Sequence, residues 1–147
     1  MARYVTSVST PLSPQAAFDY MADVRRFAEW DPGVSRAVRV VGDGHTVGSA
    51  YDLTVKAGGT SVMRYVVKQL DAPRRIFLVA KTTFFVSEDE IRVEPAGQGA
   101  KVTYDATLRL NGPLALFDPL LRLAFNRIGD RAAAGLRRAL TGTQVQA

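Results

Sequence analysis

The chain has 147 residues, 47% of them hydrophobic and 22% charged, which is typical of one globular domain and too short for two. It has no cysteine, which excludes disulfides and thiolate sites, and no stretch reaches the roughly 18 apolar residues of a membrane span, so we expect a cytoplasmic protein without stable membrane insertion. The net charge of +5 comes from basic residues that are scattered or lie among acids and alanines near the C-terminus, so we expect no nucleic-acid partner.

The N-terminal part of the chain predicts a strand followed by short helices. Val5–Thr10 has the composition of a strand and ends where Pro11 and Pro14 prevent its continuation. Ser13 is placed to cap a helix that has Pro14 at its first position. Apolar residues at helical spacing then predict one or two short helices, to about Ala28.

Trp30, the only tryptophan, follows these helices. The turn Asp31-Pro32-Gly33 ends the helical segment and starts a strand, because proline disfavours helical backbone in the residue before it and glycine tolerates positive φ. Trp30 is therefore expected at a corner between a helix and a strand.

From Val34 onward the hydrophobic period changes to two, which predicts strands joined by short turns, one of them at Gly58-Gly59. Each strand has an apolar and a polar face, so we expect an antiparallel sheet with its apolar face covered. The expected strands are Ser35–Val41, Ala50–Lys56, Thr60–Leu70, Ile76–Lys81, Phe84–Glu94 and Lys101–Leu110.

The C-terminal segment is the predicted cover. Apolar residues recur at steps of three and four from Phe117 onward, which predicts a long amphipathic helix that ends near Thr141-Gly142. We expect a short helical lead-in from about Leu114 and a kink at Pro119. Residues 143–147 are expected to form a disordered tail after a single domain, 1–142.

His45 is the only histidine and lies in the loop Asp43-Gly44-His45-Thr46. A histidine metal site or a Ser-His-Asp relay would have to use it. Turn chemistry accounts for all its neighbours, so we expect a solvated loop residue and neither a metal site nor a triad.

The acidic run Glu88-Asp89-Glu90 falls within one predicted strand. Alternation sends Glu88 and Glu90 to the polar face and Asp89 to the apolar face. A carboxylate there must be paired, hydrogen-bonded or raised in pKa, which suits a general base or a ligand anchor. The alternative is a bulge or strand end that lets Asp89 reach water. Arg131, at the edge of the helical stripe, is a candidate partner.

Three tyrosines, Tyr51, Tyr65 and Tyr104, also fall on apolar strand faces. One interpretation is core packing with a satisfied hydroxyl group, and the other is that the phenols reach a cavity and bind a ligand oxygen.

The order of elements resembles the SRPBCC superfamily, which includes START proteins, pollen allergens and polyketide cyclases. The resemblance covers nearly the whole chain and implies an α+β helix-grip fold: a curved antiparallel sheet of about seven strands wraps around a long C-terminal helix and leaves a cavity for lipids, sterols, polyketides or hormones. The matching stretches are the opening strand with Pro11 and Pro14, the corner from Asp23 to Val34, Gly48, Asp71–Ile76, the turn at Gly99 into Lys101–Tyr104, Asn111–Leu114 and Phe117–Leu120.

The resemblance leaves Trp30 with two interpretations, a packing residue of the core or a part of the cavity mouth. Our first hypothesis is a protein that binds a small hydrophobic ligand without a cofactor or metal, as a monomer or homodimer. The candidate ligand-binding residues are Trp30, Tyr51, Leu53, Met63, Tyr65, Phe85, Asp89, Tyr104, Phe117, Leu121, Phe125, Ile128 and Arg131.

Two other hypotheses remain. An aromatase/cyclase-like enzyme would use Asp89, a tyrosine or an inward arginine to move protons. The aromatase-cyclases carry an inward arginine on a middle strand, whereas Arg64 falls on the polar face with Lys68, which counts against this hypothesis. A protein-interaction module would use the basic C-terminal helix and would require an exposed apolar patch.

Overall fold

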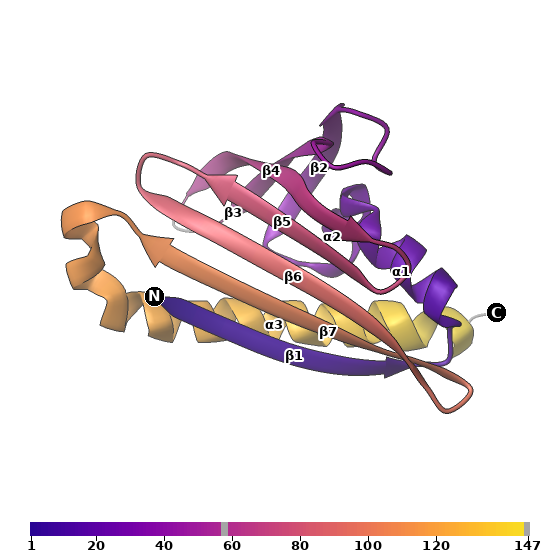
Figure 1. The fold of residues 1–147 in the computed structure, drawn as a ribbon. Coiled ribbons are helices and arrows are strands. Elements are labelled where there is room, and N and C mark those ends of the chain that lie inside the picture. The colour runs from indigo at the N-terminus through magenta and orange to yellow at the C-terminus, as the bar shows by residue number, and fades with distance from the viewer. Residues whose placement is uncertain (57–58, 146–147) are drawn as a thin grey trace.

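A computed structural model describes residues 1–56 and 59–145, within which seven antiparallel strands and one long helix form two layers (Figure 1). The strands are β1 Ala2–Thr10, β2 Val34–Val41, β3 Ala50–Lys56, β4 Thr60–Asp71, β5 Arg75–Lys81, β6 Phe85–Ala96 and β7 Gly99–Leu110. The helices are α1 Pro14–Ala22, η1 Val24–Arg26, α2 Phe27–Trp30, η2 Gly112–Phe117 and α3 Asp118–Val145.

The strands run in the order β1-β7-β6-β5-β4-β3-β2, so β2 to β7 form a meander and β1 pairs with the last strand. This confirms the helix-grip architecture. The strands are longer than predicted at several ends: β1 begins at Ala2 and β6 continues to Ala96. The predicted turn at Gly58-Gly59 falls partly outside the described residues.

The short helices begin where the sequence predicts, but there are three helical segments, and the last ends at Trp30 and not near Ala28. The Ser13 side chain accepts a hydrogen bond from the backbone N–H of Ala16 at 3.1 Å, with Pro14 in the first turn. After Trp30, the Asp31 carboxylate accepts a hydrogen bond from the N–H of Gly33 at 2.9 Å, which stabilises the turn into β2. Trp30 therefore lies at the predicted corner.

Helix α3 lies along β1 on one side of the sheet and also contacts α2 (Figure 1). Close approach requires glycine at two helical positions. A Cβ on Gly129 would lie 2.3 Å from the Tyr4 ring, and one on Gly135 would lie 1.8 Å from the carbonyl oxygen of Trp30. The side of α3 that packs against the rest of the protein therefore contains small residues at the points of close approach. Leu136 and Leu140 are buried on this side near the C-terminal end of the helix.

The prediction that the apolar stripe from Phe117 onward is buried against the sheet is wrong in the first turns of α3, where large apolar side chains are exposed. The helix also continues past its predicted end at Thr141-Gly142, to Val145. A single glycine costs a helix only about 1 kcal/mol, and no proline follows it. Pro119 lies in the first turn of α3, where a proline ring is accommodated. Residues 146–147 of the predicted tail lie outside the described residues.

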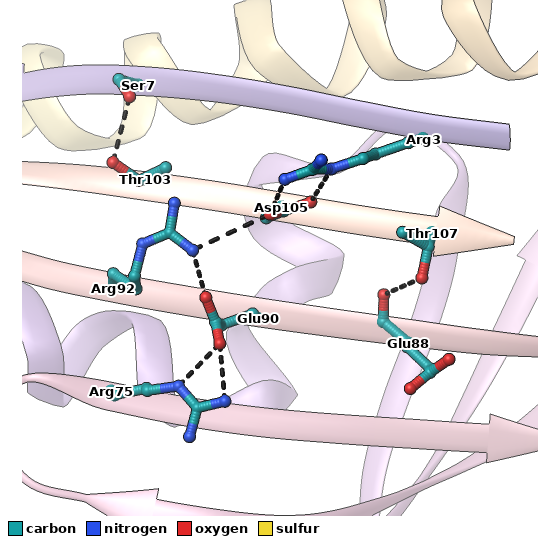
Figure 2. A network of polar contacts seen from close by, with 9 residues as sticks. All are labelled: Arg3, Ser7, Arg75, Glu88, Glu90, Arg92, Thr103, Asp105 and Thr107. Atoms are coloured by element: carbon teal, nitrogen blue, oxygen red, sulfur yellow. Dashed lines mark hydrogen bonds and ion pairs between the residues drawn. The ribbon is translucent and has the colours of Figure 1, made fainter.

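The outer face of the sheet carries a row of ion pairs across four strands (Figure 2). Arg3 on β1 donates to Asp105 on β7 at 2.8 Å, and Arg75 on β5 donates to Glu90 on β6 at 2.7 Å. Arg92 contacts both Glu90 and Asp105. Because side chains alternate along a strand, pairs that hold Glu90 outward direct the preceding residue, Asp89, inward.

Candidate functional site

A cavity of about 260 Å³ lies between the inner face of the sheet and α3, next to the α2–β2 corner. Most of the apolar wall comes from inward positions of β3, β4, β6 and β7 and from the side of α3 toward the sheet, where Ile128 is 41% exposed. These residues are Leu53, Val55, Met63, Phe85, Ala106, Leu108, Phe125, Ile128, Ala132, Ala133 and Leu136. Lys56 and Ser61, which are exposed, lie at its rim beside the β3–β4 connection.

The structure brings most of the candidate residues together around this cavity. They reach it from α2, four strands and α3, which are far apart in the sequence. The candidates in the wall are Trp30, Leu53, Met63, Tyr65, Phe85, Asp89, Tyr104, Phe125 and Ile128.

Four candidates lie outside the wall. Tyr51 is buried on the expected face of β3, but its hydroxyl group lies toward Gly44, beyond the end of the cavity. Phe117 is 55% exposed in η2, and Leu121 is half-buried in the first turn of α3. Arg131 is exposed because the inward side of α3 is centred on Gly129 and Leu136, and about 100° per residue turns position 131 away from it.

Asp89 is the main polar group of the cavity. It is 6% exposed, on a stretch of β6 paired without a bulge to Leu78 of β5 and Ala106 of β7. Asp89 therefore lies on the inner face, as alternation predicted. The alternative, a bulge that lets its carboxylate reach water, is absent from β6. Tyr104 donates a short hydrogen bond to its carboxylate, and Ser87 donates a second at 3.5 Å.

Burial raises the pKa of Asp89 to about 7, with a smaller contribution from the negative charge of Asp31, while the hydrogen bonds from Tyr104 and Ser87 act in the opposite direction. Near neutral pH the group is therefore divided between its acid and carboxylate forms. Burial also raises the pKa of Tyr65 and Tyr104, so both phenols remain protonated donors. The Tyr65 hydroxyl is 3.1 Å from Ser87 Oγ, which extends the polar cluster across the sheet.

Asp31 is a cavity residue that the sequence interpretation missed, because its place before Pro32 accounts for it as a turn residue. It lines the wall next to Trp30, and burial raises its pKa, opposed by the hydrogen bond from Gly33. Its position directly after the only tryptophan is the feature of the sequence that could have identified it as a cavity residue. Together with Asp89 it places two carboxyl groups in a mainly apolar wall, an arrangement that suits proton transfer or orientation of a polar group.

The core-packing interpretation of Trp30 describes the structure, and its place at the cavity mouth stays a prediction. The ring is 4% exposed and packs against Phe27 and Tyr104, with ring centroids 5.0 Å and 5.4 Å away. It also lines the cavity, and its indole Nε1 is buried without a hydrogen-bond partner among the described residues.

Two other expectations concern residues away from the cavity. His45 is exposed in its loop, and no group of three potential metal ligands occurs among the residues that the structure describes. Arg64 is exposed on the outer face, as alternation predicted, and donates a hydrogen bond to Asp52 at 2.8 Å.

In the described part of the chain, no helix has the length and apolar character to cross a membrane.

An exposed apolar patch lies at η2 and the start of α3, away from the sheet. Its side chains are between 55% and 83% exposed, which meets the condition set by the protein-interaction hypothesis without identifying a partner. The patch consists of Leu116, Phe117, Leu120 and Leu123.

Solved structures with the same fold come from several sources. A START superfamily protein from Mycobacterium smegmatis superposes with a TM-score of 0.78 over 95% of this chain and 97% of its own, at 16% identity. A protein from Thermus thermophilus gives 0.72 over 95% of both chains, at 17% identity. The di-domain aromatase/cyclase StfQ from the steffimycin biosynthetic pathway gives 0.70 at 14% identity; this chain covers 52% of it and is itself 99% covered.

At these identities the likeness concerns the fold. No curated protein matches the sequence. The sequence profile of one family, described as polyketide cyclase/dehydrase and lipid transport, matches residues 1–141. The chain belongs to this polyketide cyclase/dehydrase and lipid transport family, within the SRPBCC superfamily.

Proposed function

We propose that the protein binds a small hydrophobic molecule in the cavity between the sheet and α3. The observation that carries the proposal is a cavity of about 260 Å³ with a mainly apolar wall and one polar cluster. Ligand sites typically combine apolar walls with a few placed polar groups and measure roughly 300–1,000 Å³ for drug-sized ligands. The volume therefore suits a ligand at or just below the small end of that range.

The wall residues would have two roles. Apolar side chains such as Leu53, Met63 and Phe125 would remove the ligand surface from water, at about 25 cal/mol per Å² of apolar area. The cluster around Asp89 and Tyr104 would orient the polar part of the ligand.

Binding of tetralin, an uncharged bicyclic hydrocarbon, tests this proposal. We expect calorimetry to give saturable binding to the parent protein. Ala132→Phe, which places a ring in the cavity wall, should abolish binding, whereas Ala124→Phe, on an exposed position of the same helix, should leave it unchanged. Equal binding by both variants, or no binding by the parent, would refute the proposal.

A second candidate function is a cyclase-like enzyme. The observation that favours it is that two carboxyl groups line the cavity, half-buried Asp31 and buried Asp89, with Tyr104 as a protonated donor beside Asp89. The outward position of Arg64 counts against it. Turnover of a poly-β-ketone that falls at least tenfold in Asp89→Asn, with tetralin affinity unchanged, would establish the enzyme, and the absence of turnover in the parent would exclude it for that substrate.

A further inference from the structure

We propose that the protein docks reversibly on an anionic lipid surface through the outward side of α3 and the segment before it. The apolar side chains of η2 and of the first turns of α3 would enter the acyl-chain boundary, while arginines farther along α3 would contact the phosphate headgroups. The proposal goes beyond the proposed function, because it concerns the outer surface of the molecule and requires no ligand in the cavity.

The exposed apolar patch of η2 and α3 lies at one end of the molecule, past the end of β7 (Figure 1). The turn between β5 and β6 lies beside it, because the backbone N–H of Asn111, just before η2, donates to the carbonyl oxygen of Phe84 at 2.8 Å. The Phe84 side chain is 61% exposed and adds another large apolar group at this end. Exposed apolar side chains gathered in one place mark a protein or membrane interaction site.

The outward side of α3 continues from this patch as a row of arginines. A helix turns about 100° per residue, so Arg127 and Arg131 lie within about 20° of Leu120 around the helix axis, and Arg138 returns to the same angle. All of these side chains are exposed. Gly129 lies on the opposite side of the helix, against Tyr4 of β1, so the arginine row (Arg127, Arg131 and Arg138) faces away from the sheet.

The arginine row has no acidic partner within residues 1–56 and 59–145, where none of its members forms an ion pair. The two acids of α3 are engaged with the N-terminal segment. Asp118 accepts a hydrogen bond from the N-terminal amino group, and Asp130 accepts one from the hydroxyl group of Tyr4 at 2.6 Å. The outward side of α3 is therefore cationic.

A bilayer that contains anionic lipids matches both parts of this surface. It presents phosphate groups above an apolar layer, so it can accept leucine and phenylalanine side chains and bind neighbouring arginines at the same time. The arginine row spans roughly 17 Å of helix, at about 1.5 Å per residue, which a headgroup layer can contact along its whole length. A nucleic acid would contact the arginines but leave the apolar patch in water. The combination therefore favours a lipid surface.

Sedimentation with vesicles tests the proposal, using vesicles of equal parts phosphatidylglycerol and phosphatidylcholine and vesicles of phosphatidylcholine alone. We expect the parent protein to bind the anionic vesicles and to bind the neutral ones about tenfold more weakly or less. Leu116→Gln/Leu120→Gln should lower the affinity for anionic vesicles about tenfold, because it removes apolar area that would otherwise leave water. The matched control, Val41→Gln/Val47→Gln, changes two exposed valines at the opposite end of the sheet and should bind like the parent.

A second pair of variants tests the arginine row at constant net charge. Arg127→Gln/Arg131→Gln should weaken binding to anionic vesicles about five-fold for each arginine. Arg36→Gln/Arg39→Gln removes the same charge from exposed positions of β2, at the sheet edge farthest from β1 and α3, and should weaken binding less than about three-fold. Because the two variants have equal net charge, a difference between them locates the contact on α3.

Failure of the parent to bind anionic vesicles, or an equal loss in the two arginine variants, would overturn the proposal. Binding that is unchanged in Leu116→Gln/Leu120→Gln would also overturn it, because the protein would then bind polyanions in general. Equally tight binding of the parent to soluble polyglutamate would assign the surface to an acidic protein instead. All the substituted side chains are exposed, so we expect urea unfolding midpoints close to that of the parent; Leu116→Gln alone, outside α3, replaces the double variant if its midpoint falls.

Discussion

Replacing Asp89 by asparagine tests the buried carboxyl group through the pH dependence of stability. Burial raises the pKa of Asp89 from 3.8 to about 7 in the folded protein. Between these two values the folded state binds more protons than the unfolded state, so this group makes the protein less stable as pH rises. Each pKa unit corresponds to about 1.4 kcal/mol, so the loss amounts to about 4 kcal/mol and is nearly complete at pH 8.

Asparagine cannot ionise, so the variant escapes this loss. We expect the free energy of unfolding of Asp89→Asn, minus that of the parent, to rise by about 4 kcal/mol from pH 4 to pH 8, measured by urea denaturation of both proteins. The difference cancels the titration of all other groups that the two proteins share. A constant offset from the contacts of the introduced amide does not affect the slope.

The control is Asp52→Asn on the outer face of the sheet. The hydrogen bond from Arg64 lowers the pKa of Asp52, so the corresponding difference should fall as pH rises. A difference for Asp89→Asn that stays flat, or that falls like that of Asp52→Asn, would show that Asp89 is not held in an apolar cavity.

Two further substitutions test the packing of α3. Gly135→Ala should destabilise the protein by about 1–3 kcal/mol in urea denaturation, because its Cβ would lie 1.8 Å from the carbonyl oxygen of Trp30; a gain in stability, as at an ordinary helical site, would contradict this contact. Thr10→Val should cost about 1 kcal/mol, because the buried hydroxyl of Thr10 donates to the carbonyl of Leu140 at 2.8 Å and joins β1 to the end of α3; an unchanged unfolding midpoint would show that this hydrogen bond contributes nothing.

Strand positions could be predicted because alternation is a local property. The inward side of Asp89 and the outward side of Arg64 both follow from counting along a strand, and the structure has both. Counting does not tell how far along the sheet the cavity extends. Tyr51 is thus on the expected face but beyond the cavity, because its place depends on the packing of the Gly44 loop.

The helix was harder to predict because α3 carries two apolar stripes. The buried side predicted from Phe117 onward included Leu120, but both Phe117 and Leu120 are exposed. The side that contacts the sheet is built on Gly129 and Gly135, and their need for close approach is visible only once Tyr4 and Trp30 are in place. The expectation for Arg131 failed for the same reason.

The measurement that tests the ligand site most directly is native mass spectrometry of the protein purified gently from the organism that produces it. We expect a discrete adduct of one small hydrophobic molecule per chain, present in the parent protein and in Ala124→Phe and lost in Ala132→Phe. A spectrum with only the bare polypeptide mass, together with no binding of tetralin, would contradict the claim that this cavity is a ligand site.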